Sequence, residues 1–210
     1  MKGERRWISV SAEGAASVTP DSAVVSLSVS GSGKALAPTR DDVNGRTSAV
    51  LAMLRELGLA DVDLNAPDVG IHPEYEYRKG QRLIGYRVVR QVAAKVRDLD
   101  RLGDVLDGVV AAGANEVHGA QMRSSDPSAA EHEALRTAVA AARAKAEVLA
   151  AAAGATLGAV ARIAEEPDLG ASPLPKFRTM AMAESADVPT EVTAGELTIT
   201  RRIRAWFTIS

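Results

Sequence analysis

The chain has 210 residues, of which 46% are hydrophobic, so it can bury one substantial core or two small ones without metals or disulfides. It contains no cysteine, which excludes thiol nucleophiles, disulfides and thiolate metal sites. Its formal net charge is -2, so the chain lacks the excess of basic residues that is typical of nucleic-acid-binding domains. We therefore predict a single domain over residues 1–210 and no nucleic-acid partner.

The first part of the chain predicts two strands and a helix. Residues 7–12 alternate, and residues 23–29 place valine and leucine on one face and serine on the other, which is typical of an antiparallel strand with one face in water. Residues 39–57 have helical spacing and end at Gly58, with a threonine and Asp42 near the N-terminus. The residues at helical spacing are Val43, Thr47, Val50, Leu51 and Leu54. We expect this amphipathic helix to cover a sheet.

Residues 68–96 predict a β-hairpin, because two alternating runs are joined by a polar turn at residues 78–81. Apolar side chains of one parity in each arm are expected to form a single face. They are Val69, Ile71, Tyr75 and Tyr77 in the first arm, and Ile84, Tyr86, Val88 and Val92 in the second. Pro73 places the first arm at a sheet edge or at a bulge, and a bulge there would turn the two tyrosines outward.

Two helices and a strand are predicted in the middle of the chain. The first helix is capped by Asp98 and ends at Gly113, and a short strand follows near residues 116–124. The second helix runs over residues 126–154, because an Asp-Pro pair supplies a cap and a first-turn proline. Its apolar side is mostly alanine, so we expect close packing. The larger apolar residues on that side are Leu135, Val139 and Leu149.

The C-terminal part predicts two strands around a segment without periodicity. Residues 160–164 form the first strand, and the proline-containing residues 167–194 are expected to be a long mobile loop. Residues 196–209 alternate and predict a final strand that closes the sheet. The fold class is therefore α+β, with a mainly antiparallel sheet covered by amphipathic helices that include one long Ala-rich helix.

The polar side of the final strand carries a candidate protein interface. It consists of Arg202, Arg204 and Trp206. Arginine and tryptophan are favoured at the centres of protein interfaces. Burial of Trp206 in the core is the alternative.

No catalytic, cofactor-binding or metal-binding constellation emerges from the sequence. The three histidines, His72, His118 and His132, lack the spacing of metal ligands, and no nucleophile elbow is present. His72 alternates with Glu74 and Glu76 on one strand face, which makes a carboxylate–imidazole group sterically possible. A solvated sheet face is the simpler interpretation. We therefore predict a protein that is not an enzyme and has no cofactor and no metal.

The N-terminal sequence MKGERRWISV passes directly into an alternating strand and lacks the apolar core of a signal peptide. No window approaches the ~18 consecutive apolar residues of a membrane span. The sequence as given therefore predicts a cytoplasmic protein without a membrane span. A periplasmic or envelope protein from which an export signal has been removed is the alternative.

Several short motifs, in their order and spacing, resemble the SIMPL-domain family. They are Pro20-Asp21, His72-Pro73-Glu74-Tyr75-Glu76-Tyr77, Gly85-Tyr86-Arg87, Ala112-Gly113-Ala114-Asn115, Ala153-Gly154-Ala155-Thr156-Leu157-Gly158 and Gly195-Glu196-Leu197. The resemblance implies an α+β fold, a tendency to oligomerise and no established catalytic activity, so no catalytic residue is carried over. Bacterial members are commonly exported to the envelope, so the missing signal peptide is a departure from the family pattern.

The function that we expect is that of a non-enzymatic, self-associating interaction scaffold in bacterial envelope or stress physiology. Its partners would be further copies of itself and possible other proteins. One alternative is a hydrolase that uses His72 with Glu74 or Glu76. Another is a protein that binds a small apolar ligand or peptide beneath residues 167–194, in a groove lined by Met180 or Met182.

Overall fold

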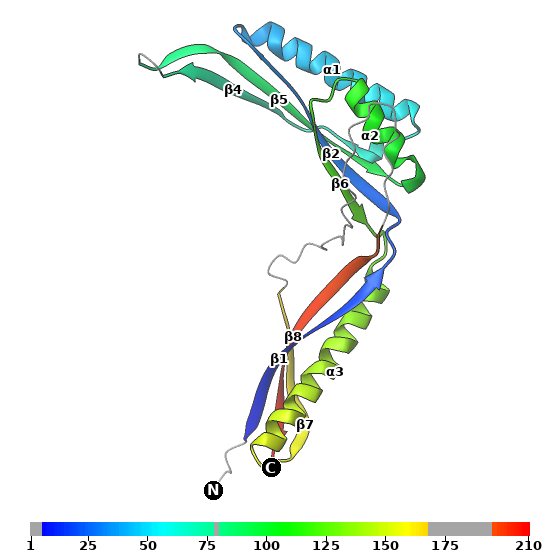
Figure 1. Cartoon of the computed structure of the whole chain (residues 1–210), viewed down its shortest axis with the longest axis vertical. Helices are drawn as coiled ribbons and strands as arrows, with labels where there is room; N and C mark the ends of the chain where they lie inside the picture. Colours follow the sequence, from blue (N-terminus) through cyan, green and yellow to red (C-terminus); the bar gives the residue numbers. More distant parts are fainter. Residues whose placement is uncertain (1–5, 78–79, 168–194) are drawn as a thin grey trace, which may run out of the picture. The chain divides into compact units, whose positions relative to one another are not determined.

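The computed structural model describes residues 6–77, 80–167 and 195–210, and there the chain forms two compact units (Figure 1). The first unit combines residues 6–20, 124–167 and 195–210, and the second holds residues 21–77 and 80–123. Both units contain α-helices and antiparallel sheets, so the predicted α+β class is confirmed. The single domain expected over residues 1–210 stays a prediction for unfolding experiments. The segment 168–194, where the mobile loop was expected, lies outside the described residues.

The second unit is a five-stranded antiparallel sheet with helices on one face. The strands are β2 (Ser22–Gly33), β3 (Leu64–Asn65), β4 (Val69–Glu76), β5 (Arg82–Val96) and β6 (Glu116–Arg123). Their order is β3-β5-β2-β6, and β4 also pairs with β5. The helical elements are α1 (Leu36–Glu56), α2 (Leu102–Ala111) and the 3₁₀ turns η1 (Asp61–Asp63) and η2 (Leu99–Arg101).

The core of the second unit lies between the helices and one face of the sheet. The alternation in β2 is confirmed, since Val25, Leu27 and Val29 are at most 1% exposed. The predicted helical stripes supply the opposing side chains. They are Val43, Val50 and Leu54 from α1, and Leu102, Val105 and Val109 from α2, all fully buried.

Helix α1 begins three residues earlier than the spacing predicted. Pro38 fits in its first turn, where a backbone N–H has no partner within the helix. Thr39 is therefore inside the helix, and its hydroxyl donates to the carbonyl of Ala35 at 2.8 Å. Asp42 is also not a cap, because its carboxylate pairs with Arg46 one turn later. By contrast, Asp98 accepts from the backbone of Asp100 at the start of η2, as its predicted capping role requires.

The hairpin formed by β4 and β5 is confirmed, but its predicted single buried face is wrong in the outer half. Val88 and Val92 are buried. Six large apolar residues of the hairpin are 37–73% exposed: Val69, Ile71, Tyr75, Tyr77, Leu83 and Ile84. Val69 and Ile71 lie at the level of Arg90 and Val88, and the other four lie nearer the tip. The hairpin reaches past the start of α1, so no helix covers this part (Figure 1). The ladder also shifts register between Glu74 and Tyr75, next to Pro73 on the edge strand.

The first unit is a three-stranded antiparallel sheet with one long helix. Its strands are β1 (Trp7–Val18), β8 (Leu197–Ile209) and β7 (Leu157–Glu166), in the order β1-β8-β7, and the helix is α3 (Ser128–Ala152). The final strand does not close one common sheet as expected. It is the central strand of the separate sheet of the first unit, because both β1 and β7 pair with it.

Helix α3 packs on the sheet through alanine. Six alanines at every fourth position are at most 7% exposed: Ala130, Ala134, Ala138, Ala142, Ala146 and Ala150. The predicted larger contacts are wrong for Val139 and Leu149, which are 38% and 45% exposed. The reason is the short distance to β1, where a Cβ at Gly14 would overlap the carbonyl oxygen of Ala134. The amide of Ser128 donates to Asp126 at 3.1 Å, as the predicted cap requires, but the N-cap position itself is occupied by Pro127.

None of the helices in the described residues combines the length and the apolar character that a membrane span requires.

Candidate functional site

The candidate interface lies on the face of β8 that points away from α3. Arg202 and Arg204 are exposed, whereas the intervening residues Ile203 and Ala205 belong to the core cluster under the helix. Trp206 is half-buried on the helix-free face, so it is not a core residue. The guanidinium of Arg162 on β7 lies 4.9 Å from the centre of the Trp206 ring, a cation–π distance.

Both arginines of the candidate interface are engaged within the first unit. Arg202 pairs with Glu13 of β1 at 2.8 Å, and Arg204 pairs with Glu166 of β7 at 2.7 Å. The arginine side chains are 57% and 51% exposed, so each pair contributes at most about 1 kcal/mol to stability. These pairs join three strands, and they reduce the charge available to an outside partner.

Both tryptophans of the chain lie on this helix-free face. Trp7 is opposite Thr208, and Ser9 is opposite Trp206, which makes the two tryptophans diagonal neighbours across β1 and β8. Trp7 is 61% exposed. Trp7 is therefore open to contact, whereas Trp206 is partly covered and both arginines are paired.

The structure does not bring His72, Glu74 and Glu76 together as the acid–base group that the hydrolase alternative requires. The carboxylate of Glu74 accepts from the hydroxyl of Ser32 at 3.1 Å, and Glu76 pairs with Arg82 at 3.1 Å. The imidazole of His72 makes no hydrogen bond with either carboxylate in the part of the chain that the structure describes. Over the same residues, no group of three or more His, Asp or Glu side chains is arranged to hold a metal ion. Met180 and Met182 lie outside the described residues.

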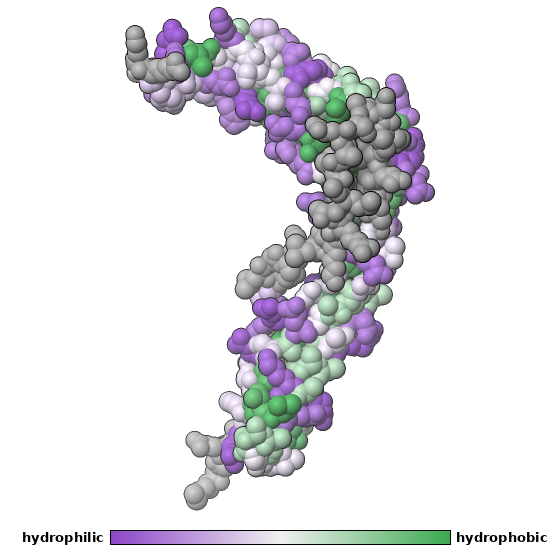
Figure 2. Space-filling view, in the orientation of Figure 1, coloured by the Kyte–Doolittle hydropathy of each residue, from purple (hydrophilic) through white to green (hydrophobic). Residues whose placement is uncertain are grey.

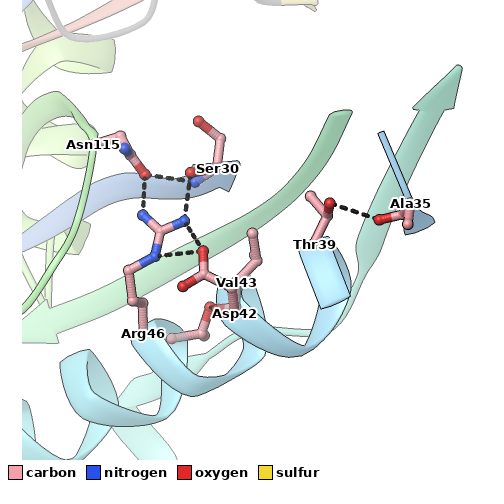
Figure 3. A network of polar contacts seen from close by, with 8 residues as sticks. Ser30, Ala35, Thr39, Asp42, Val43, Arg46 and Asn115 are labelled. Atoms are coloured by element: carbon pink, nitrogen blue, oxygen red, sulfur yellow. Dashed lines mark hydrogen bonds and ion pairs between the residues drawn. The ribbon is translucent and has the colours of Figure 1, made fainter. Parts of the chain in front are cut away.

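A polar network that the sequence analysis missed joins α1, β2 and the turn before β6 (Figure 3). The side-chain oxygen of Asn115 accepts from the amide of Ser30 at 2.6 Å and from Arg46 at 3.1 Å. Arg46 also donates to the carbonyl of Ser30 at 2.8 Å and pairs with Asp42. The turn itself contains Gly113 at φ 111°, which favours glycine. The Ala112–Asn115 motif therefore acts in folding, because it fixes the helix to the sheet.

A second missed residue is Arg90, which lies on β5 between α1 and the segment before β4. Its guanidinium donates to Asn44 at 3.2 Å and to the carbonyl of Ala66 at 2.9 Å. Its Nε is buried and has no hydrogen-bond partner within residues 6–77, 80–167 and 195–210. No apolar or charge pattern in the sequence marks this residue, because its partners lie 46 and 24 positions away.

Among the described residues, two carboxylates have lowered pKa values, and each of them holds secondary-structure elements in place. The hydrogen bond between Arg97 and Asp63 lowers the pKa of Asp63 and raises the pKa of Arg97. Hydrogen bonds from the hydroxyl and amide of Ser128 lower the pKa of Asp126. The first pair joins η1 to the end of β5, and the second starts α3.

Comparison with known proteins gives consistent matches over most of the chain. The family model SIMPL, described as a protein of unknown function (DUF541), matches residues 8–207. The 26 kDa periplasmic immunogenic protein of Brucella melitensis is 34% identical over 201 residues, which are 90% of this chain and 79% of that protein. The uncharacterized protein YggE of Edwardsiella ictaluri is 34% identical over 178 residues, which are 83% of this chain and 74% of that protein.

A third relative, the uncharacterized protein YggE of Escherichia coli K12, is 30% identical over 129 residues, covering 60% of this chain and 52% of that protein. The names of these relatives state no enzymatic activity. The family match extends through both compact units and through the motifs that first indicated the resemblance. The chain therefore belongs to the SIMPL family.

Proposed function

We propose that this protein is a non-enzymatic, self-associating interaction scaffold of the bacterial envelope or its stress response. The observation that carries the proposal is the exposed apolar side of the β4–β5 hairpin, here named the hairpin patch. It consists of Val69, Ile71, Tyr75, Tyr77, Leu83 and Ile84. Figure 2 shows hydrophobic residues among hydrophilic ones on this hairpin, and large apolar side chains exposed together are typical of interaction sites.

The hairpin patch fits a second copy of the same chain. Glu76 and Arg82, the charged pair at the outer end of the hairpin, neutralise each other at 3.1 Å. The patch itself therefore offers apolar and aromatic area, and the turn next to it carries Arg78 and Lys79 in the sequence. Such a surface can meet its own copy across a two-fold axis, as in most homodimers.

The helix-free face of the first unit is the second contact that we propose. Arg202 and Arg204 are already paired, so the binding free energy would come from Trp206 with Arg162, and from the exposed Trp7. Large aromatic side chains with arginine are the residues that dominate binding energies at protein interfaces. This contact would extend a dimer made by the hairpin patch into a larger homo-oligomer or hold another protein.

The proposed location in the envelope is supported by the relatives. The Brucella protein that is 34% identical to this chain is named a periplasmic protein. The proposal of a non-enzymatic role is supported by the separate engagement of Glu74 and Glu76, which leaves His72 without a carboxylate partner among the described residues.

Light scattering of the full chain and two variants tests self-association. Ile71→Asp places a charge in the hairpin patch at a side chain that is 43% exposed, so the fold is retained. Val62→Asp is the matched control, because Val62 is 85% exposed and lies on η1, outside the patch. We expect an oligomer for the wild type and for Val62→Asp, and a smaller species for Ile71→Asp. Identical masses for all three proteins would remove the hairpin patch from the proposal.

A further inference from the structure

The second unit has a groove of about 460 Å³ on the helix-free face of its sheet, which is the size of a small-molecule site. Its floor is formed by β2 and β5, and its sides by the segment from β3 to β4 and by β6. Six polar side chains line it: Ser26, Asn65, Asp68, His72, Gln91 and His118.

Local irregularities of the strands bring the two histidines to this groove. His118 is the extra residue of a bulge in β6, because Ser26 is opposite Gly119 whereas Leu27 is opposite Val117. Gly119 has φ 105°, a conformation that favours glycine. Bulges redirect side chains and are frequent beside functional sites. On β4, the imidazole of His72 lies over Gly70, where a Cβ would be 3.1 Å from its Nε2.

The six polar side chains of the groove are not used by the fold. None of them has a hydrogen bond or an ion pair with the part of the chain that the structure describes. Elsewhere on the same face, Ser28 bonds to Glu116 at 3.3 Å and Arg87 pairs with Glu116 at 3.7 Å. Within the described residues, the donors and acceptors of the groove are therefore free to bond to a ligand.

A single metal ion does not fit this groove. Strands β4 and β6 are separated by β5 and β2, which puts them about 14 Å apart at the usual strand spacing. His72 and His118 therefore cannot bind one ion together, and no three ligating side chains converge among the described residues.

The charge of the groove selects the class of ligand. Asp68 is its carboxylate, and among the described residues no lysine or arginine lines it, so phosphates and carboxylates are disfavoured. The amide oxygens of Asn65 and Gln91 and the hydroxyl of Ser26 add hydrogen-bond acceptors. An ammonium group carries three donors and no acceptor, and it complements this set.

We infer that the groove binds a small aliphatic amine, with the ammonium group on Asp68 and the alkyl chain along Val89 and Ala93. Both apolar residues line the floor and are half-buried. This site lies outside the proposed self-association surface. It would give the protein a ligand-binding function that is independent of its assembly.

Isothermal titration calorimetry of the full chain with cadaverine, a five-carbon diamine, tests the site. The matched neutral probe is 1,5-pentanediol, which has the same length and no charge. We expect cadaverine to bind the wild type at least about tenfold more tightly than the diol, because the charge-assisted bond is lost in the diol. No binding of cadaverine, or equal binding of both molecules, would overturn the inference.

Two substitutions separate a site from general charge attraction. Asp68→Asn is expected to weaken cadaverine binding by about tenfold or more, whereas Asp104→Asn, at an exposed acid on α2, leaves it unchanged. Gln91→Leu, which removes a groove acceptor without changing charge, should weaken binding to a smaller extent. Circular dichroism confirms that the variants are folded. Equal losses for Asp68→Asn and Asp104→Asn would refute the site.

The variant Leu83→Asp, which lies in the hairpin patch and away from the residues that line the groove, distinguishes the two proposals. It should bind cadaverine like the wild type even where it no longer self-associates. Failure of the cadaverine titration would leave the self-association result unaffected.

Discussion

The two units cover one face of a sheet with helices in opposite ways. In the second unit, Val43, Val50 and Leu54 of α1 fill the space above the sheet with branched side chains. In the first unit, α3 presents alanines and lies so close to β1 that only a glycine fits at position 14. The second core is therefore filled by side-chain volume, and the first by close approach of backbones.

The sheet faces that the helices leave uncovered also differ in their chemistry. Each sheet keeps a helix-free face in its own unit. In the first unit that face is cross-linked by Arg202–Glu13 and Arg204–Glu166 pairs. In the second unit it contains a groove whose Asp68 and Gln91 have no partner among the described residues. We propose a macromolecular contact for the first face, through its tryptophans, and a small ligand for the second.

The largest expected effect is the loss of volume from the second unit. Leu54 is fully buried, so Leu54→Ala should reduce the free energy of unfolding by about 2–5 kcal/mol through lost burial and a residual cavity. Urea denaturation followed by circular dichroism measures this change. A loss below about 1 kcal/mol would show that α1 can collapse onto the sheet, and that the second core is not filled by volume as described.

In the first unit, by contrast, added side-chain volume should lower the free energy of unfolding. Ala142 is fully buried under α3, so Ala142→Leu should cost about 1–3 kcal/mol by overpacking. Ala141→Leu is the matched control, because position 141 is exposed on the same helix, and its effect should stay within about 0.5 kcal/mol. Thermal unfolding compares the two variants. If both had the same effect, close helix packing would not limit the size of these residues.

The smallest expected effect is a pH dependence of stability, which arises from one carboxylate in each unit. The pKa values of Asp63 and Asp126 are lowered from the ordinary 3.8 by hydrogen bonds, from Arg97 and Ser128 respectively. Because each native pKa lies below the unfolded value, the stabilisation is complete above about pH 4 and is lost as the pH falls through the native pKa. Asp63→Asn and Asp126→Asn should therefore be less stable than the wild type at neutral pH and should approach it in acid.

Urea unfolding of the three proteins from about pH 7 to about pH 2 measures this convergence. A difference from the wild type that stays constant over the whole range would contradict the assigned hydrogen bonds.

The sequence predicted those elements whose signal is local and periodic. Alternation located β2 and its buried residues, and the Asp126–Pro127 pair located the start of α3. Periodicity could not show which alanines touch the sheet, because Val139 and Leu149 are larger and share the apolar side. It also could not show that β8 is a central strand, since pairing with β1 joins residues at opposite ends of the chain.

The surfaces were predicted less well than the core, for the same physical reason. The positions of Arg202, Arg204 and Trp206 on one face follow from the two-residue period of a strand, but their pairing with Glu13 and Glu166 depends on folding. The network of Arg46 with Asn115 joins residues 69 positions apart. The groove between His72 and His118 likewise exists only after four strands are paired.

Sedimentation velocity of the full wild-type chain over a concentration series tests the central claim of self-association most directly. The account predicts a sedimentation coefficient that rises with concentration toward that of an oligomer, and a loss of this rise in Ile71→Asp but not in Val62→Asp. A wild-type chain that sediments as a monomer throughout the micromolar range would contradict it.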